Sequence, residues 1–462
     1  MRTLKQILVL GAGQSAPYLI SRLLDLAQEH DWQITVGDRD ADLAARRVGD
    51  HTRGRAIAFD INDGESRDRW IGEADVVVNM LAPRFLDLVA WDCLAHSTPM
   101  LSVSYRTRPI RDMHEEAVRK NTLLLCELGL DPGIDHMSAM ALIDRVDREG
   151  GHVRAFRSYG SGVPAPENAD TNPMRYVVTW NPRNVAMSSE TGAQYMEHGH
   201  IKCVPFHHVF HHTWHVDVDG VGRLEAYPNR DSLSYMQSFG LDEVETMIRG
   251  TLRYPGWSET WSRIVALGLP NEHLRIPDLE NRTYRDVVEM FLPMILSGDR
   301  VPDIEERVSK FLDISPTGRI MENLRWLGLF SDEKIEGQGE TAAAMLTNLL
   351  ARKMPLRHGD RDVVIIKHEL DVEYDDRPAE HIGSTMVHRG EPDGFTAMAR
   401  SVGAPVVMVT RLLLTGELDL VGAHLPLHPS IHGPVLRDLG DEGMAFTETR
   451  GPVADSGARG AG

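Results

Sequence analysis

The sequence predicts an α/β protein. Its parts are a doubly wound parallel sheet of the Rossmann type, an inserted α+β second domain, and a C-terminal helix that returns to the first domain. Three observations predict this fold class. Short apolar runs alternate with helical patterns over residues 1–150, and a glycine-rich turn joins the first run to the first helical stretch. Beyond residue 150 the strands become longer and more polar, and glycine and proline are frequent. Alternating strands and helices are typical of a parallel sheet covered on both faces.

The strands of the first domain are predicted from apolar runs that are too short for helices. Strands buried on both faces of a parallel sheet have this composition. Between the first two runs, apolar residues recur at helical spacing from Ala16 to Ala27, which predicts a helix with one apolar face. The predicted strands are 6–10, 33–36, 55–59, 74–78, 99–103 and 122–126.

The second domain is predicted to mix strands with helices. Residues 232–350 are mainly helical in pattern, and the apolar stretch Ala397–Leu420 predicts a helix that packs back on the first domain. The glycine-rich tail from Thr449 has nothing to bury, so we expect it to be disordered. Further strands are predicted at 153–159, 176–180, 206–216 and 361–374. The predicted domains are 1–150, 151–395 and 396–448, followed by a disordered tail at 449–462.

Composition excludes several classes of function. The chain has 49 Lys and Arg against 68 Asp and Glu, a net charge of −19, which disfavours a nucleic-acid partner because a polyanion would be repelled. No run approaches the ~20 apolar residues that span a bilayer, so we expect no membrane partner. The three cysteines have no paired spacing, which argues against a disulfide framework or zinc module and for a cytoplasmic location.

The turn after the first predicted strand has the form GxGxxA. Gly11 permits the tight turn, Gly13 lets a pyrophosphate approach the backbone, and Ala16 allows close packing of helix on strand. The N–H groups at the start of the helix then face the phosphates. An ordinary glycine turn in a flavodoxin-like sheet is the alternative, but the strand before and the helix after favour a dinucleotide site.

The end of the second predicted strand bears on the choice of cofactor. Asp38 can accept from the ribose hydroxyls and would repel a 2′-phosphate, which favours NAD. Arg39 could instead pair with that phosphate, so NADP is the alternative. Asp60 either holds the adenine amino group or caps a helix. The predicted cofactor-binding residues are Gly11, Gly13, Gln14, Ser15, Ala16, Asp38, Arg39, Asp60, Ala82 and Pro83.

The stretch Glu127–His136, with the string GLDPGIDH, follows a strand and opens a helix, so Asp131 is expected at the carboxyl edge of the sheet, where such folds bind ligands. The string is similar to the signature of the saccharopine dehydrogenase family, especially its glutamate-forming saccharopine reductases. The resemblance runs from about residue 5 to 440. It also rests on segments 102–105, 158–166, 172–173, 227–232, 249–256 and 402–405.

The resemblance implies an NAD(P)-dependent oxidoreductase that acts on CH–NH donors in lysine metabolism. It would convert saccharopine and water to L-glutamate and 2-aminoadipate semialdehyde, or run the reverse reaction, in a cleft between the domains. Asp131 and Tyr105 would be the catalytic residues, since this chemistry needs groups that handle protons or the ammonium. Arg230 and Arg253 can each make bidentate pairs with substrate carboxylates. The other implied substrate-binding residues are Ser104, Asn172 and Thr251. A homodimer is also implied.

Some features leave alternatives open. Fungal saccharopine reductases carry a cysteine where this chain has Gly160 followed by Ser161, so the substrate could be another amino-acid-derived secondary amine of the carboxynorspermidine or opine type. A non-catalytic protein that senses dinucleotides is the alternative from another class. His207, His211 and His215 would point to one face of a strand, where a transition metal is chemically feasible, but the family needs none and we expect no metal.

Overall fold

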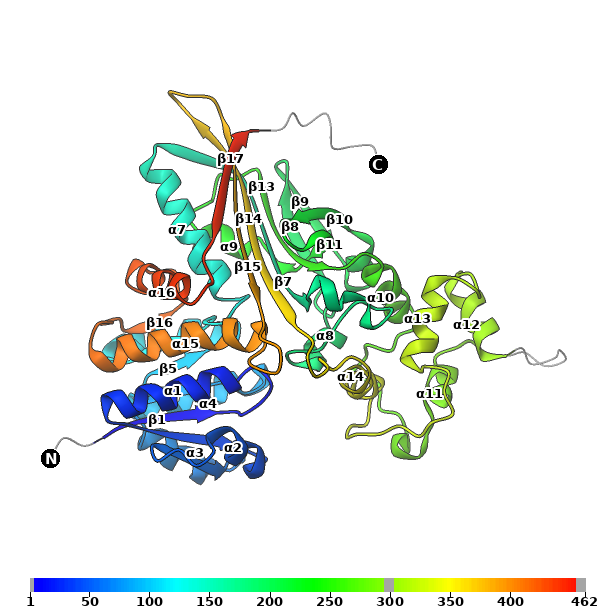
Figure 1. Ribbon diagram of the computed structural model, residues 1–462, viewed down its shortest axis with the longest axis horizontal. Coiled ribbons are helices and arrows are strands. Elements are labelled where there is room, and N and C mark those ends of the chain that lie inside the picture. Colours follow the sequence, from blue (N-terminus) through cyan, green and yellow to red (C-terminus); the bar gives the residue numbers. More distant parts are fainter. Residues whose placement is uncertain (1–3, 295–302, 454–462) are drawn as a thin grey trace. The chain divides into compact units, whose positions relative to one another are not determined.

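The computed structural model describes residues 4–294 and 303–453 (Figure 1). The chain divides into two compact units. Unit 1 combines the residues up to Val153 with those from Val363 onward, and unit 2 is Arg154–Asp362. The return to the first unit therefore begins at Val363 and not at residue 396, which corrects the boundary expected from the sequence.

Unit 1 contains a seven-stranded sheet in the order β16-β6-β5-β4-β1-β2-β3. Every neighbouring pair in it is parallel. The order 3-2-1-4-5-6 is that of the Rossmann fold, so this part of the prediction is confirmed. The strands are β1 (Lys5–Leu10), β2 (Trp32–Asp38), β3 (Gly54–Ala58), β4 (Val76–Asn79), β5 (Met100–Ser102), β6 (Leu123–Leu125) and β16 (Gly422–His424).

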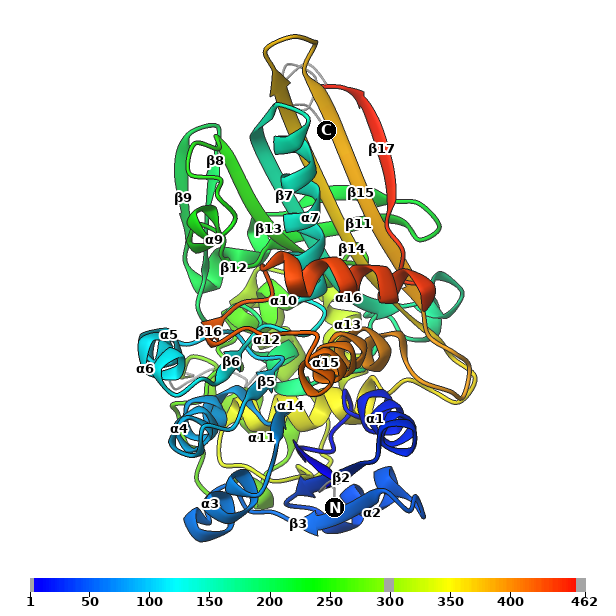
Figure 2. The same ribbon diagram turned by 90° about the vertical axis from the view of Figure 1, so that its left-hand side faces the viewer.

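Helices lie on both faces of this sheet because its strands are apolar on both sides. On one face Leu8 and Leu10 join a core with α3 and α4. Helix α15 lies beside α1 in both views (Figures 1 and 2). The helices of unit 1 are α1 (Pro17–His30), α2 (Ala41–Val48), α3 (Gly64–Gly72), η1 (Pro83–Phe85), α4 (Leu86–His96), α5 (Arg108–Asp112), α6 (His114–Arg119), α7 (Ile134–Arg148), α15 (Ala397–Thr415) and α16 (Pro429–Asp441).

The C-terminal part of unit 1 also forms an antiparallel ribbon. Its strands are β14 (Asp362–Tyr374), β15 (Glu380–Arg389) and β17 (Thr447–Pro452). Because β17 pairs along β15 and Arg450 forms ion pairs with Glu149 and Glu380, residues 449–452 are ordered. The expectation of disorder from residue 449 is therefore wrong for these residues, and 454–462 lie outside the described part.

The sheet of unit 2 is mixed. β13 runs parallel to β7 and antiparallel to β11, and a hairpin of β8 and β9 joins it through β8. The strands are β7 (Gly151–Pro164), which begins in unit 1, β8 (Ala193–Glu197), β9 (His200–Val204), β10 (Trp214–Val218), β11 (Gly222–Pro228), β12 (Arg230–Asp231) and β13 (Thr246–Arg253).

Two strands expected in unit 2 are not formed. Residues 176–180 carry only an isolated bridge at Val178, because their apolar side chains pack into the core of the unit from a loop. Residues 206–211 form a 3-10 helix, since Val209 and Phe210 insert into the same core while the flanking histidines face solvent. Only the last part of the expected strand 206–216 is extended, as β10.

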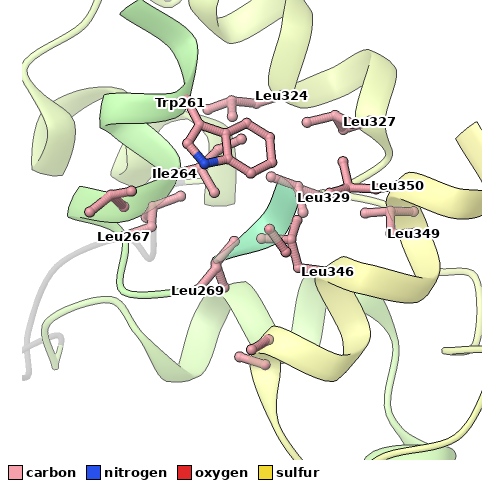
Figure 3. Close-up of a cluster of buried hydrophobic side chains, with 14 of the residues drawn as sticks. Trp261, Ile264, Leu267, Leu269, Leu324, Leu327, Leu329, Leu346, Leu349 and Leu350 are labelled. Carbon is pink, nitrogen blue, oxygen red and sulfur yellow. The ribbon is translucent and has the colours of Figure 1, made fainter. Parts of the chain in front are cut away.

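The rest of unit 2 is helical and surrounds an apolar core (Figure 3). Trp261 and Ile264 of α10 meet leucines of α13 and α14, and each fully buried side chain of this size contributes roughly 1.5–3 kcal/mol. The helices are η2 (Pro166–Thr171), α8 (Pro182–Ala186), η3 (Phe206–His211), α9 (Ser234–Ser238), α10 (Trp257–Ala266), η4 (Leu279–Asn281), α11 (Tyr284–Met290), α12 (Ile304–Leu312), α13 (Arg319–Leu327) and α14 (Ala342–Lys353).

Candidate active site

The turn between β1 and α1 has the geometry that a dinucleotide needs. Gly11 has a φ of +103°, and a Cβ there would lie 3.1 Å from the carbonyl of Met80, so only glycine fits. At Gly13 a Cβ would meet nothing within 4 Å, which leaves open space beside the backbone. Ala16 is buried, and its N–H donates to the carbonyl of Gly13 at 3.1 Å. The turn therefore fits a pyrophosphate.

Asp38 stands where the sequence places it, at the end of β2. Its carboxylate accepts the N–H of Ala12 at 2.8 Å and the N–H of Asp40 at 2.9 Å. Arg47 donates its Nε to the carbonyl of Ala12 at 3.3 Å, so an anion and a cation contact the backbone of the same residue of the turn. Burial and the neighbouring Arg46 lower the pKa of Arg47.

The remaining predicted cofactor residues lie in solvent-facing loops or in the turn. Gln14 and Arg39 are exposed and Ser15 is partly exposed, whereas Ala82 and Pro83 are exposed directly after β4, at the edge where β1 also ends. Asp60 accepts hydrogen bonds from Asn62 at 2.9 and 3.0 Å. Asp63 caps helix α3, so the alternative role of Asp60 as a helix cap is wrong.

Ser104 and Tyr105 follow β5 at the carboxyl edge of the same sheet. Ser104 is buried, and its carbonyl accepts the N–H of Glu127 at 3.0 Å. Glu127 also accepts the N–H of Arg106 through its Oε1 at 2.9 Å. Glu127 therefore holds the backbone on both sides of Tyr105, whose side chain is partly exposed.

Asp131 lies in a compact turn between β6 and α7. The N–H of Gly129 donates to the carbonyl of Pro132 at 2.9 Å, and the N–H of Ile134 donates to the carbonyl of Gly129 at 2.9 Å. A Cβ on Gly133 would lie 2.1 Å from the carbonyl oxygen of Gly129, so this turn requires glycine. Asp131 is partly exposed among buried neighbours, as a carboxylate that meets a ligand should be.

A buried group of ionisable residues stands directly behind this turn, and the sequence reasoning did not assign it a role. His136 is fully buried, with its Nε2 2.7 Å from Glu127 Oε2 and its Nδ1 3.1 Å from Asp135 Oδ2. Burial alone would lower its pKa, but the two carboxylates raise the pKa of His136 to about 9. The signal that could have found the group is the presence of three ionisable residues at a junction of strand and helix.

Arg253, at the end of β13 in unit 2, is a buried cation to which the described residues give no ionic partner. It is 4% exposed, and among the described residues no carboxylate lies within the 4.0 Å that defines an ion pair. Its Nη1 donates to the carbonyl of Leu252 at 2.8 Å and to Ser161 Oγ at 3.3 Å, whereas its Nε has no hydrogen-bond partner in the described part of the chain. The rings of Tyr176, Trp257 and Tyr227 lie 4.8, 5.8 and 5.9 Å from its guanidinium.

Asn172 and Thr251 lie near this cation but have local partners. Asn172 donates its Nδ2 to the carbonyl of Tyr176 at 2.8 Å, so it fixes the residue whose ring stacks on Arg253. Thr251 pairs with Tyr227 across β13 and β11 and forms a hydrogen bond with it. Burial raises the pKa of Tyr227, and the charge of Arg253 opposes that shift. Both residues thus shape the surroundings of Arg253.

Arg230 does not lie next to Arg253. The N–H of Asn229 donates to the carbonyl of Arg249, which lies four residues, roughly 13 Å, before Arg253 along β13, and the next residue, Arg230, pairs with Ala193 of β8. Its φ of 52° is unusual for an arginine. It lines a hollow of about 760 Å³ together with Gln194, Cys203 and Asp231.

The predicted site residues divide between the two units. Unit 1 holds the dinucleotide turn and brings Ser104, Tyr105 and Asp131 to one edge of the parallel sheet. Unit 2 places Asn172 and Thr251 near the buried cation Arg253 and holds Arg230 further along the sheet. Each set is coherent within its own unit.

The histidine cluster is not a strand face. His207, His208 and His211 belong to the 3-10 helix η3, where the rings of His207 and His208 pack at 4.4 Å. Among the described residues no group of three His, Cys, Asp or Glu side chains has an arrangement that could hold a metal ion. One helix among the described residues, α15, is long and apolar enough to span a bilayer, but 72% of its apolar stretch is buried inside the protein.

A Rossmann sheet with this turn, and a carboxylate at its edge, is the arrangement expected of a dinucleotide-dependent oxidoreductase. Family models of the saccharopine dehydrogenase NADP binding domain and the saccharopine dehydrogenase C-terminal domain match residues 7–125 and 129–444. The chain belongs to the saccharopine dehydrogenase family. The prediction of an NAD(P)-dependent oxidoreductase of this type, acting on CH–NH donors, is confirmed.

Individual relatives agree with this membership. The glutamate-forming, NADP-named saccharopine dehydrogenase of Saccharomyces cerevisiae is 30% identical over 95% of this chain and 97% of its own length. The mitochondrial alpha-aminoadipic semialdehyde synthase of Bos taurus is 31% identical over 97% of this chain but 48% of its own length. The apo structure of the yeast enzyme has a TM-score of 0.82 and covers 97% of this chain and 100% of its own at 30% identity.

Proposed function

We propose that this protein catalyses the NAD(P)-dependent conversion of saccharopine and water to L-glutamate and 2-aminoadipate semialdehyde, or the reverse. The name of the yeast relative, of which the chain covers 97%, supports this substrate. So does the site chemistry. The substrate carries three carboxylates and a secondary amine. Arg230 and Arg253 can bind carboxylates, and Asp131 at the edge of the parallel sheet can bind the amine.

The observation that carries the proposal is the burial of Arg253 without a carboxylate. A buried, unpaired charge costs several kcal/mol, so such a charge is expected where an anionic ligand completes it. The partnerless Nε and the forked geometry of the guanidinium suit a carboxylate. The rings of Tyr176 and Trp257 hold the guanidinium plane in place from its sides.

The reaction assigns a task to each group. Bound NAD(P) supplies the hydride acceptor for the carbon beside the amine. Asp131 takes the amine proton as the carbon–nitrogen bond becomes an imine, and Tyr105 donates a hydrogen bond or proton at the same centre. Water then adds to the imine carbon and the carbon–nitrogen bond breaks, with the nitrogen staying on glutamate. Arg253 and Arg230 hold carboxylates throughout.

For the cofactor we propose NAD in preference to NADP. Two backbone N–H groups hold the Asp38 carboxylate in the turn, where the ribose would lie. The relatives named for NADP and the nearby Arg47 make NADP the alternative. The ratio of kcat/KM for the two cofactors decides between them, and a clear NADP preference contradicts this choice.

A substrate panel tests the proposed reaction. The purified chain is mixed with NAD or NADP and with saccharopine, carboxynorspermidine or an opine, and formation of the reduced nicotinamide is followed by absorbance. We expect turnover with saccharopine, with L-glutamate as a product identified by chromatography. Turnover of another secondary amine, without turnover of saccharopine, would replace saccharopine as the proposed substrate. Cofactor binding with no turnover of any of them would contradict an enzyme of this class.

A further inference from the structure

Glu127, His136 and Asp135 form one continuous chain of polar contacts between the two candidate catalytic residues. At one end the Glu127 carboxylate accepts the N–H of Arg106, next to Tyr105. At the other end Asp135 Oδ1 accepts the N–H of Gly133 at 2.6 Å, two residues after Asp131. His136 joins the two carboxylates in the middle. All of these residues belong to unit 1.

The group is built at an energetic cost that the fold alone does not explain. Glu127, Asp135 and His136 are 4%, 3% and 0% exposed. Replacing buried ion pairs by apolar residues of similar size is often neutral or stabilising, so stability alone does not require three charges at this junction. Buried polar networks specify one geometry, because each member has a fixed partner.

Glu127 is placed to control the position of Tyr105 in particular. Its own N–H donates to the carbonyl of Ser104, and its side chain accepts from Arg106, so it grips the residues on both sides. Its φ of 61° is unusual for glutamate, which shows that the surrounding contacts dictate this conformation. Asp135 likewise pins the turn that carries Asp131, together with its own N–H bond to the carbonyl of Leu130 at 3.1 Å.

We propose that Glu127, His136 and Asp135 are positioning residues for catalysis. They hold the Tyr105 segment and the Asp131 turn in fixed positions relative to each other at the edge of the parallel sheet. None of the three touches the reacting atoms. They act through the backbone that carries the two residues that do. The inference rests on the proposed function, because it assigns Tyr105 and Asp131 to the reaction.

The test compares two substitutions of one residue. Glu127→Gln keeps the oxygen that accepts from Arg106 and can still bond His136, whereas Glu127→Ala removes both contacts. We expect Glu127→Ala to lower kcat by about 10- to 100-fold, since misplacement by about 1 Å costs on this order. The Kd for the reduced dinucleotide, measured by nucleotide fluorescence, should stay within about threefold because the turn at Gly11 is not involved. Glu127→Gln should keep kcat within about threefold.

A folded Glu127→Ala protein with wild-type kcat would overturn the proposal, as would equal losses of kcat in the two variants. If Glu127→Ala does not fold, His136→Gln takes its place. It retains one donor and removes the second contact, and its kcat should fall at least about fivefold with an unchanged Kd for the dinucleotide. A wild-type kcat in that variant overturns the proposal equally.

Two controls keep the outcomes distinct. Glu149→Gln removes an ion pair with Arg450 in the same unit and should leave kcat unchanged. Failure of the proposed function shows in the wild-type protein itself, as no turnover of saccharopine with a normal Kd for the dinucleotide. Failure of the positioning role shows only in the variants, against a wild-type protein that turns saccharopine over.

Discussion

Arg253 and His136 are charged side chains at 4% and 0% exposure, and the chain compensates them in opposite ways. His136 has two carboxylates of the chain beside it, whereas Arg253 has rings, a hydroxyl and a carbonyl but no anion among the described residues. A buried charge that is neutralised by side chains of the same protein has a structural role. A buried charge without such a partner is expected to be neutralised by a bound ligand. This difference assigns positioning to the first residue and substrate binding to the second.

The charge on Asp38 should set the cofactor preference. Replacing Asp38 by Asn removes the negative charge that would meet a 2′-phosphate but keeps an oxygen for the N–H of Ala12. At a few ångströms such a repulsion is worth about 1–4 kcal/mol. We expect the ratio of kcat/KM for NAD over NADP to fall by about tenfold or more. Asp50→Asn, at the far end of α2, is the matched control, and an unchanged ratio in both variants contradicts the role of Asp38.

The raised pKa of His136 predicts a loss of stability at alkaline pH. The folded protein keeps this proton up to a pKa of about 9, whereas the ordinary pKa of a histidine is 6.5, so between these values the folded state binds more protons than the unfolded state. The stabilising contribution is complete below about pH 6.5 and lost as pH rises through about 9. Urea unfolding at several pH values should show this decline. His136→Gln should lack it, and the exposed His152→Gln should retain it.

The residues of the site were predictable to different degrees. Gly11, Gly13 and Asp38 could be predicted because backbone geometry makes the same demands in every dinucleotide turn. Asp131 could be placed at the edge of the sheet from the strand before it and the helix after it, whereas Arg253 was named through a resemblance to known motifs, since nothing in its immediate spacing distinguishes it from other arginines. The partners of Glu127 could not be predicted, because Arg106 and His136 come from segments that meet only in the folded sheet.

At the scale of elements, the turn between β1 and α1 separates the demands of folding from those of binding. Gly13→Ala adds a methyl group where nothing lies within 4 Å, so folding should be unaffected while the methyl occupies the space for a pyrophosphate. We expect the Kd for the dinucleotide to rise by about tenfold and the Tm to change by less than about 2 °C. Gly11→Ala, against the Met80 carbonyl, should lower the Tm as well. A wild-type Kd for Gly13→Ala would be incompatible with this account.

Helix α15 depends on a glycine where it crosses α1. A Cβ on Gly403 would lie 3.0 Å from the backbone nitrogen of Leu19 and 3.2 Å from its Cβ. We expect Gly403→Val to destabilise the protein by about 1–3 kcal/mol through overpacking, measured by urea unfolding. In contrast, Gly440→Ala in α16 meets nothing within 4 Å and should be neutral or slightly stabilising. Equal effects of the two changes would show that α15 does not rely on close approach.

Helices and strands could be predicted where the apolar residues followed one clear pattern, either a short continuous run or helical spacing. Six of the seven strands of the parallel sheet, all but β16, and helix α15 follow from apolar runs and helical spacing. Segment 206–211 misled the prediction because its mixture of histidines and apolar residues imitates a half-exposed strand, whereas Val209 and Phe210 anchor a 3-10 helix. The strand β17 could not be predicted, because a polar edge strand is stabilised by the partner it pairs with and not by its own composition.

At the scale of the whole molecule, unit 1 is built from both ends of the chain. The strand β16 extends the parallel sheet beside β6, and α15 covers α1, so the dinucleotide fold is complete only after the C-terminal part has been added. The return was predictable from the apolar helix at 397–420. Its start at Val363 was not, because β14 alone could belong to either unit on its sequence.

The central claim is that a dehydrogenase of this family grips a substrate carboxylate with Arg253. The most direct measurement is the KM for saccharopine in wild type, Arg253→Gln and, as a control, Arg154→Gln, whose arginine pairs with Glu245 at the surface. A hydrogen-bonded pair with a charged group is worth about 1.5–3 kcal/mol, so the KM should rise by about 10- to 100-fold in Arg253→Gln alone. An Arg253→Gln protein that folds, binds the dinucleotide and shows the wild-type KM would contradict the account.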